Sequence, residues 1–284
     1  MKFSAKFKKT AAVSCAAALT AFTVIGLDHR LTVRYYTARS EKINNPVRIA
    51  LITDLHSCRY GEKQQKLIGA IEAEDPDLVL MSGDIFDNDM STENSEIFLR
   101  EIIKKFPCYF AIGNHECKEG KEDHDYKMSI LNRYGIPVLS GQVETVNVNG
   151  SDINICGVDD PTVYTFEPEG DEEKFYEQLQ TVRELSQNGN YSVLLAHRPD
   201  LFAWYSECGF DLVLSGHAHG GQWIIPGFLN GVLAPNQGLF PKLAGGEYRN
   251  GGTTMIVSRG LARESTLVPR FYNRPELVIV DLNN

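Results

Sequence analysis

Side chains that commonly bind metals follow short apolar runs at five places along the chain. The five groups are Asp54 with His56; Asp84 with Asp87; Asn114, His115 and Glu116; His197 alone; and His217 with His219. In α/β sheets, ligand sites form where strands deliver their carboxyl ends, so we expect the five groups to converge. Carboxylate, amide and imidazole ligands together suit zinc, iron or manganese better than calcium.

The spacing within the groups also favours a shared site. Residues i and i+2 of an extended chain project to the same side, so Asp54 with His56 is predicted to aim two ligands at one point, and likewise His217 with His219. Glycine precedes three of the groups, at positions 83, 113 and 216, where the backbone can turn sharply. A single histidine after a strand is more often structural than a ligand. Because five of the seven histidines fall in these groups, a metal site is favoured.

In this order the groups resemble the motifs of calcineurin-like metallophosphoesterases. The matching segments are Asp54-Leu55-His56, Gly83-Asp84-Ile85-Phe86-Asp87, Gly113-Asn114-His115-Glu116, His197 and Gly216-His217-Ala218-His219. The resemblance extends from about Arg48 to the C-terminus. It implies an α/β fold, a four-layer α/β/β/α sandwich of two mixed β-sheets flanked by helices, and the hydrolysis of phosphate esters.

The resemblance also implies two divalent metal ions, Mn, Zn or Fe, bridged by Asp84. The ligands of the first would be Asp54, His56, Asp84 and His219, and those of the second Asp84, Asn114, His197 and His217. Two such ions bring four positive charges and the two carboxylates cancel two, which leaves about +2 to hold a phosphate. Ions about 3.5 to 4 Å apart can also activate a bridging water for attack on phosphorus.

Further residues are assigned catalytic or substrate-binding roles. His115 resembles the family's proton donor to the leaving group, a role that suits imidazole near pH 7. Asp87 is predicted to orient His115 and stabilise its charged form, with a turn cap as the alternative, and Glu116 is expected to support the ligands. Three arginines are candidate substrate contacts or, equally, solvated surface charge: Arg259, Arg263 and Arg270.

Other segments resemble the bacterial, membrane-anchored branch of the family. They are His197-Arg198-Pro199-Asp200, residues 216–223, Gln237-Gly238-Leu239-Phe240-Pro241, Ser258-Arg259-Gly260-Leu261 and Arg274-Pro275-Glu276. Some relatives there cleave phosphodiester or pyrophosphate bonds in envelope lipids or nucleotide sugars. The chain departs from the wider pattern at Asn88, where protein phosphatases carry a phosphate-binding arginine, and at Ala262, where glycine is frequent. We therefore expect a phosphodiesterase or pyrophosphatase acting on an envelope lipid, a nucleotide sugar or another small phosphate ester. The alternative is a metal-binding envelope protein without turnover.

The N-terminal segment differs in composition from the rest of the chain. Residues 10–27 are 18 residues without a charge and follow four lysines. As a helix they would extend about 27 Å at 1.5 Å per residue, close to the roughly 30 Å of a bilayer core. We expect residues 1–30 to be a single-pass membrane anchor or a cleaved signal segment, and residues 31–284 to be one catalytic domain, located outside the cytoplasm.

Composition limits the possible partners. The chain is 43% hydrophobic and 23% charged, as is typical of a globular fold. Beyond residue 27 there are 24 basic against 37 acidic residues, a balance of −13, without a basic cluster, so nucleic acid is not an expected partner. The six cysteines match no metal-binding or disulfide pattern and are expected to be buried thiols. The protein is expected to be a monomer that binds a small-molecule or lipid-linked phosphate ester.

Strand and helix signals alternate in a way that can position these groups. Strands are predicted at 31–36, 47–53, 77–82, 108–112, 143–148, 152–158, 192–196, 212–215, 253–258 and 277–282, and helices at 63–73, 96–106, 123–134 and 172–187. Asn149-Gly150 is the strongest hairpin signal in the chain. Alternating strands and helices followed by hairpins predict mixed sheets. Trp204 and Trp223 are expected to pack in the fold, with a wall of the substrate groove as an alternative for Trp223.

Overall fold

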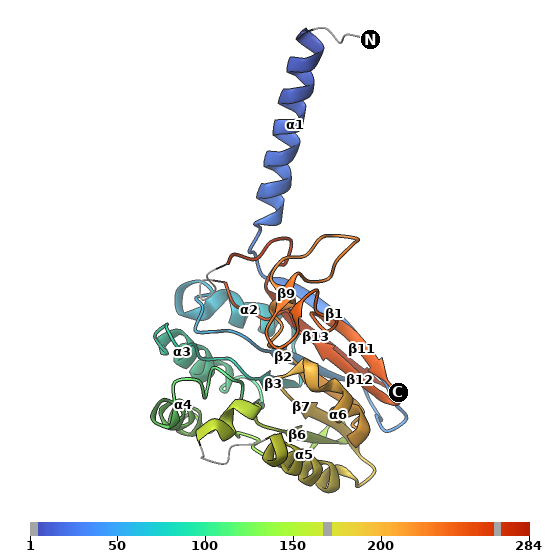
Figure 1. Ribbon diagram of the computed structural model, residues 1–284. Coiled ribbons are helices and arrows are strands. Elements are labelled where there is room, and N and C mark those ends of the chain that lie inside the picture. Colours follow the sequence, from blue (N-terminus) through green and yellow to red (C-terminus); the bar gives the residue numbers. More distant parts are fainter. Residues whose placement is uncertain (1–4, 167–171, 264–267) are drawn as a thin grey trace.

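The computed structural model describes residues 5–166, 172–263 and 268–284, and its body is built on two stacked sheets (Figure 1). The first sheet has five strands in the order β1-β13-β2-β3-β4. They are β1 (Thr32–Arg39), β13 (Glu276–Asn283), β2 (Val47–Ile52), β3 (Leu78–Ser82) and β4 (Cys108–Ala111). Only the β13–β2 pair is antiparallel, so β2, β3 and β4 all deliver their carboxyl ends to one edge.

The second sheet has six strands in the order β11-β12-β8-β7-β6-β5. They are β11 (Gly246–Asn250), β12 (Thr253–Val257), β8 (Leu212–Ser215), β7 (Tyr191–Leu195), β6 (Ser151–Gly157) and β5 (Gln142–Val148). Strands β12, β8, β7 and β6 are parallel, and antiparallel hairpins close both edges. Asn149 and Gly150 turn the β5–β6 hairpin with φ of 51° and 81°, as their dipeptide predicts.

Three apolar cores join the sheets and helices into four layers. Ile49 and Leu51 on one face of β2 pack against residues of the second sheet such as Val193. Ala50 and Ile52 on the other face pack against α2 (Gln65–Glu74), α3 (Glu93–Ile102) and α4 (Lys121–Arg133). The outer face of the second sheet is covered by α5 (Glu172–Ser186) and α6 (Phe202–Cys208). Because side chains alternate along a strand, β2 can bury both faces. The predicted α/β sandwich of two mixed sheets with flanking helices is confirmed.

Most predicted elements occur within a few residues of their predicted bounds. The predicted helix 96–106 is an exception, since α3 spans Glu93–Ile102 and is followed by turns. Pro107 restricts the residue before it to extended conformations, which stops the helix short of the strand. The sequence patterns did not predict β11, α6 or the short hairpin of β9 (Leu233–Ala234) and β10 (Gly238–Leu239).

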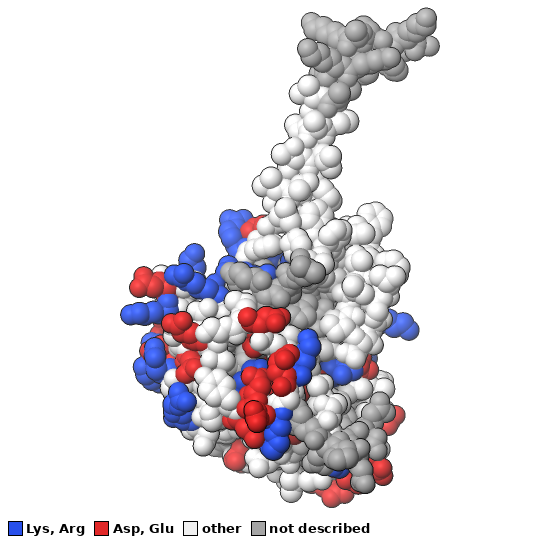
Figure 2. Space-filling model, turned by 60° about the vertical axis from the view of Figure 1, so that its left-hand side comes forward, with Lys and Arg blue, Asp and Glu red and all other residues white. Residues whose placement is uncertain are grey.

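Helix α1 (Ala5–Gly26) projects from the body (Figure 1). Its base is held by Tyr272, whose hydroxyl donates to the carbonyl of Phe22 at 3.0 Å and whose amide donates to that of Gly26 at 2.7 Å. Figure 2 shows no charged side chain on the part of α1 that it draws in white, whereas both signs of charge cover the body. Across the described ranges, no helix meets the length and hydropathy needed to cross a membrane.

The six cysteines are free thiols, and all but Cys15 are buried. The expectation of buried thiols is therefore confirmed for the five cysteines beyond residue 27 and is wrong for Cys15. Burial raises the pKa of the Cys108 and Cys156 thiols to about 12.

Candidate metal centre

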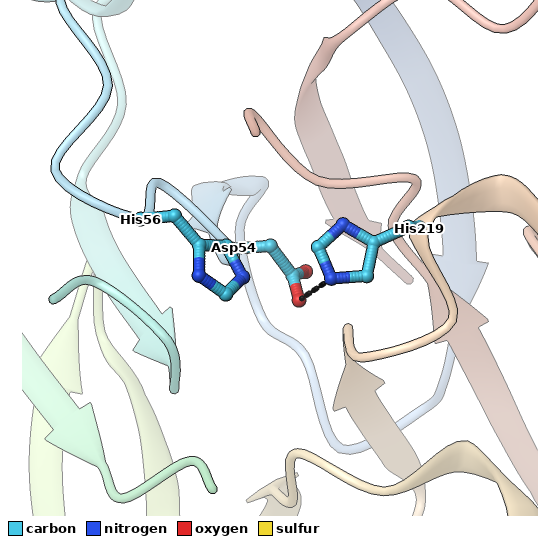
Figure 3. Close-up of side chains that lie close together, drawn as sticks. All are labelled: Asp54, His56 and His219. Carbon is cyan, nitrogen blue, oxygen red and sulfur yellow. Dashed lines mark ion pairs between the residues drawn. The ribbon is translucent and has the colours of Figure 1, made fainter. Parts of the chain in front are cut away.

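The structure brings the predicted side chains together at the carboxyl edges of both sheets. Three groups of side chains have ligand atoms that lie within 4.8 Å of one another: Asp54, His56 and His219; His56, Asp84 and His115; and Asp84, His197 and His217. Figure 3 shows the first group, in which the ring of His219 and the carboxylate of Asp54 point toward each other, with Nε2 and Oδ1 3.7 Å apart. Strands β2, β3 and β4 of one sheet and β7 and β8 of the other deliver these groups.

The backbone at the ligands is left-handed, which the extended-chain argument did not anticipate. Asp54, His56 and Asp84 have φ of 51°, 47° and 55°, and His217 and His219 have φ of 64° and 46°. Such values are uncommon outside glycine and cluster at functional sites. The predicted alternation of residues i and i+2 is therefore wrong here. Tight loops, rather than extended strand ends, bring Asp54 to His56 and His217 to His219.

All three flanking glycines are required by close approach, and a Cβ on Gly83 would collide with Gly113 and His197. A Cβ on Gly216 would collide with Thr53 Oγ1 and Asp54 Oδ2, and one on Gly113 would collide with Asp84 Oδ1. Only Gly83, with φ of 80°, has the left-handed backbone expected of a sharp turn. These glycines therefore let ligand carboxylates from neighbouring loops lie directly against the backbone.

Asp84 lies at the centre of the site. Its Oδ2 is 3.4 Å from His56 Nε2 and 3.1 Å from His197 Nε2, and its Oδ1 accepts a hydrogen bond from the His115 amide at 2.8 Å. Burial alone would raise the pKa of Asp84, but the imidazoles of His197 and His56 hold it well below its usual value. The buried carboxylate of Asp84 thus faces the imidazole of His56, which follows a strand of the first sheet, and that of His197, which follows a strand of the second.

Hydrogen bonds from the far side of each ring fix how the histidines are presented. His197 Nδ1 lies 2.7 Å from the Ser82 carbonyl, and His217 Nε2 lies 2.7 Å from Asn236 Oδ1. His56 Nδ1 lies 3.0 Å from Asp87 Oδ2. A ring nitrogen that donates to an oxygen leaves the other nitrogen with its lone pair available for a metal ion. Asn236 was not singled out from the sequence, although it directly precedes the segment that begins at Gln237, because its contact with His217 is made by the tertiary structure.

Several predicted ligand atoms are buried without a hydrogen bond to another described residue. His56 Nε2, His197 Nε2 and Asn114 Oδ1 are buried and have no hydrogen-bond partner among the residues that the structure describes. A buried polar atom without a partner costs about 1 to 3 kcal/mol, so three at one site call for a bound partner. The donor set of imidazole, carboxylate and amide fits divalent metal ions in that position. The His/Asp groups are therefore consistent with a binuclear metal site.

The two predicted catalytic side chains lie beside this centre. The ring of His115 is 4.3 Å from that of His56 in an edge-on arrangement, and burial lowers its pKa to about 4. Asp87 Oδ2 bonds to His56 and lies 3.8 Å from His115 Nδ1, beyond hydrogen-bond distance. Its Oδ1 accepts from the amides of Asp89 and Met90, as a turn cap does. Asp87 thus hydrogen-bonds to His56 and orients that ring, while its contact with His115 is an ion pair at 3.8 Å whose charge favours the imidazolium of His115.

Glu116 ties together the two loops that carry Asp84 and Asn114. It is fully buried, and its Oε2 accepts hydrogen bonds from the amides of Asp84 and Gly113, both at 2.8 Å. Its Oε1 accepts from the amides of Ile85 and Phe86 at 2.9 and 3.1 Å. Burial, with the nearby charge of Asp84, raises the pKa of Glu116 to about 6. Glu116 thus supports the loops of the metal ligands, as expected, through these four hydrogen bonds.

Two of the three candidate arginines are held by protein groups. The guanidinium of Arg259 bonds to Glu276 Oε2 at 3.2 Å and to Asn230 Oδ1 at 2.9 Å. Arg263 donates to the carbonyl of Arg59 and lies over the ring of Tyr60, 4.6 Å from its centre. These contacts give both side chains partners within the protein, and their substrate contacts stay predictions.

Arg270 is different, because it is 1% exposed and only part of its guanidinium is bonded. Its Nε donates to the Ala262 carbonyl at 2.7 Å, while Nη1 and Nη2 find no hydrogen-bond partner within the described part of the chain. The charge of Asp54 acts on Arg270, and that of Arg270 acts on His219, so it lies within electrostatic reach of the metal ligands. Of the three candidates, Arg270 is the one with both Nη atoms unpartnered among the described residues.

Known proteins share this pattern. The family described as Calcineurin-like phosphoesterase matches residues 47–221. The uncharacterized metallophosphoesterase YkuE of Bacillus subtilis (strain 168) is 28% identical over 265 residues, which cover 90% of this chain and 87% of the relative. Phosphodiesterase YaeI of Escherichia coli (strain K12) is 26% identical over 185 residues, covering 64% of this chain and 63% of the relative.

A solved structure agrees at the level of the fold. The protein TT1561 of Thermus thermophilus superposes with a TM-score of 0.50 at 12% identity, over 76% of this chain and 90% of that chain. The family match spans the five groups from Asp54 to His219, whose His/Asp clusters are described above. The chain belongs to the calcineurin-like phosphoesterase family, as a metal-dependent phosphoesterase.

Proposed function

We propose that the protein hydrolyses phosphodiester or pyrophosphate bonds in a small or lipid-linked phosphate ester, using two divalent ions, Mn, Zn or Fe. The observation that carries the proposal is the position of Asp84, whose Oδ2 lies 3.4 Å from His56 Nε2 and 3.1 Å from His197 Nε2. A carboxylate in this position can be shared by two ions. When bound, such ions supply Lewis-acid activation of the phosphoryl group and of water.

The seven proposed ligands divide between the two ions around this carboxylate. The first ion would be held by Asp54, His56, Asp84 and His219, and the second by Asp84, Asn114, His197 and His217. The clusters of Asp54 with His56 and His219, and of Asp84 with His197 and His217, support this division. Asn114 precedes His115, whose amide bonds to Asp84 Oδ1, and its own carbonyl oxygen Oδ1 is buried and unpartnered within the described ranges.

His115 is the proposed donor of a proton to the leaving group. Its side chain is 22% exposed, so it can reach a bound substrate from the rim of the centre. The pKa of about 4 that burial gives it in the absence of ligands disfavours the imidazolium. A phosphate anion in contact with the ring would favour the charged form, so the acid role depends on the substrate being bound. Arg270 would add a second positive contact for the phosphate.

Asn88 supports a substrate other than a phosphoprotein. Its Oδ1 lies 3.3 Å from the ammonium of Lys127, which is 1% exposed and also donates to the His115 carbonyl at 2.7 Å. The position that carries a phosphate-binding arginine in protein phosphatases is therefore engaged in a contact beneath His115. Diesters and pyrophosphates remain the favoured class.

We also propose that residues 1–30 hold the protein at the cell membrane, as an anchor or as a signal segment, with the catalytic domain outside the cytoplasm and acting as a monomer. Support comes from the 18 uncharged residues at 10–27 and from the uncharged, exposed side chains of α1 from residue 13 to residue 25. Fractionation of cells that express the full chain tests the proposal. Recovery of the uncleaved chain in the soluble fraction would count against it.

Turnover separates the proposed enzyme from its rival, a metal-binding envelope protein without activity. The assay is hydrolysis of bis(p-nitrophenyl) phosphate by the full chain with Mn²⁺, with a chelator-treated sample as the control. We expect metal-dependent release of p-nitrophenol, lost in the His115→Ala variant while its metal content is retained. A metal-loaded protein that cleaves neither mono- nor diesters would overturn the enzyme proposal.

A further inference from the structure

An apolar groove opens directly beside the metal centre. It is lined by His219, residues 221–223, residues 232–235 and Val268, and has a volume of about 680 Å³. Binding sites for small molecules commonly enclose about 300 to 1,000 Å³ and are lined mainly by apolar groups. His219 is both a wall of this groove and a member of the cluster with Asp54 and His56. Groove and metal centre therefore share a side chain and are immediate neighbours.

Contacts across the groove hold its walls in place. The Val232 amide donates to the Gly221 carbonyl at 2.9 Å, and a Cβ on Gly221 would collide with Gly231. Trp223 is fixed by a hydrogen bond from Nε1 to the Pro269 carbonyl at 2.9 Å and by its ring contact with Phe271, with centres 5.7 Å apart. The groove is preformed, so little conformational entropy would be lost in ordering it around a ligand.

The chemistry of the walls selects against polar occupants. Trp223, Leu233 and Val268 are 45%, 55% and 47% exposed, respectively, and no Asp, Glu, Lys or Arg is among the described residues that line the groove. Among the described lining residues the polar side chains are His219 and Gln222; the side-chain nitrogen of Gln222 donates to the Val268 carbonyl, and its Oε1 is buried without a partner in the described ranges. A sugar or a nucleotide base has several polar groups, and these two side chains could replace only a few of the hydrogen bonds to water that it would lose there, which is costly. A hydrocarbon chain would gain from burial against these side chains.

We propose that this groove binds a linear alkyl chain carried by the phosphoester substrate, while the phosphate of the same molecule lies at the metal centre. The inference rests on the proposed function and extends it, because it selects an amphiphilic substrate over a nucleotide sugar. The shared residue His219 carries the step from groove to substrate: a molecule with its phosphate at the metals has the groove as its apolar neighbour. Phe228, 90% exposed in the same loop region, is not part of the lining and provides a comparison.

The test is a series of methyl, butyl and octyl p-nitrophenyl phosphodiesters, used as monomers with the Mn²⁺-loaded full chain in detergent-free solution. Burial of a methylene can raise binding up to about fourfold, so we expect kcat/KM to be at least about tenfold higher for the octyl ester than for the methyl ester, mainly through KM. In Leu233→Asn, the advantage of the octyl ester should fall at least threefold while hydrolysis of the methyl ester is retained. The matched control Phe228→Asn should leave both rates unchanged.

Three results would overturn the groove without touching the proposed activity. They are equal kcat/KM for all three esters, an octyl advantage that Leu233→Asn does not reduce, and an octyl advantage that Phe228→Asn reduces as much. The last result would indicate a general apolar surface, such as one that contacts a bilayer or a second copy of the chain.

A binding measurement keeps the two proposals separate. Methylphosphonate and octylphosphonate are titrated into the metal-loaded chain and followed by calorimetry. If no ester is hydrolysed, the proposed function fails, yet tighter binding of octylphosphonate that depends on Leu233 still supports the groove. Equal binding of the two phosphonates would refute the groove on its own.

Discussion

Glu116 offers a prediction whose size follows from its four hydrogen bonds. The substitution Glu116→Gln keeps the volume of the side chain but replaces one accepting oxygen by an NH₂ group that faces two backbone N–H donors. Two of the four bonds, from Asp84 and Gly113 or from Ile85 and Phe86, must be lost. Hydrogen bonds to a charged group contribute about 1.5 to 3 kcal/mol each, so the free energy of unfolding should fall by about 3 to 6 kcal/mol. That is a large part of the roughly 5 to 15 kcal/mol of a typical domain.

Thermal unfolding at pH 8 with Mn²⁺ present is the assay. This pH lies well above the pKa of about 6 that burial and the charge of Asp84 give Glu116, so the wild-type carboxylate is ionised. We expect Tm to fall by about 6 °C or more and metal content to fall with it. The exposed Glu119 is the matched control, because Glu119→Gln makes the same chemical change outside the site. If Glu116→Gln were as stable as Glu119→Gln, the loops that carry Asp84 and Asn114 would not depend on these bonds.

Three further predictions concern the centre and its surroundings. Asp84→Asn should lower the content of both metals, whereas His115→Ala should keep both metals and lower kcat about 10²- to 10⁴-fold. Elemental analysis and kinetics on the two variants check this prediction. A fully metal-loaded Asp84→Asn protein would contradict it. Arg270→Gln should raise the inhibition constant of inorganic phosphate while metal content stays at the wild-type level, and an unchanged constant would remove Arg270 from phosphate binding. Burial raises the pKa values of the Cys108 and Cys156 thiols to about 12. Ellman's reagent should therefore modify one thiol rapidly in the folded chain, at Cys15, and all six in denaturant. Several rapidly modified thiols in the folded protein would contradict the buried positions.

The sequence was informative about the site because its chemistry is local in the chain. Each ligand group directly follows a strand whose apolar run is legible, and parallel strands place their ends together without further information. The sequence did not indicate the backbone conformation of the ligand groups. Asp54 and His56 have left-handed backbones, a state set by contacts such as that of Asp54 Oδ2 beside Gly216, which is more than 160 residues away in the sequence.

The sequence also did not indicate hydrogen-bond and ion-pair partners that are brought together by the tertiary structure. Asp87, three residues after Asp84, was expected to be the partner of His115. The fold instead places its hydrogen bond on His56. The pairing of Arg259 with the buried Glu276 likewise depends on β13 lying in the first sheet. The groove combines His219, residues 221–223, residues 232–235 and Val268, which share no periodic pattern. Helix α6 has seven residues, too few to establish a helical repeat.

The central claim is that Asp84 stands between two metal ions. Its most direct test is an anomalous-difference map from crystals of the full chain grown with Mn²⁺. We predict two peaks on either side of the Asp84 carboxylate, one beside His56 and His219 and the other beside His197 and His217. A single peak, or two peaks of which either lies out of bonding distance of Asp84, would contradict the account.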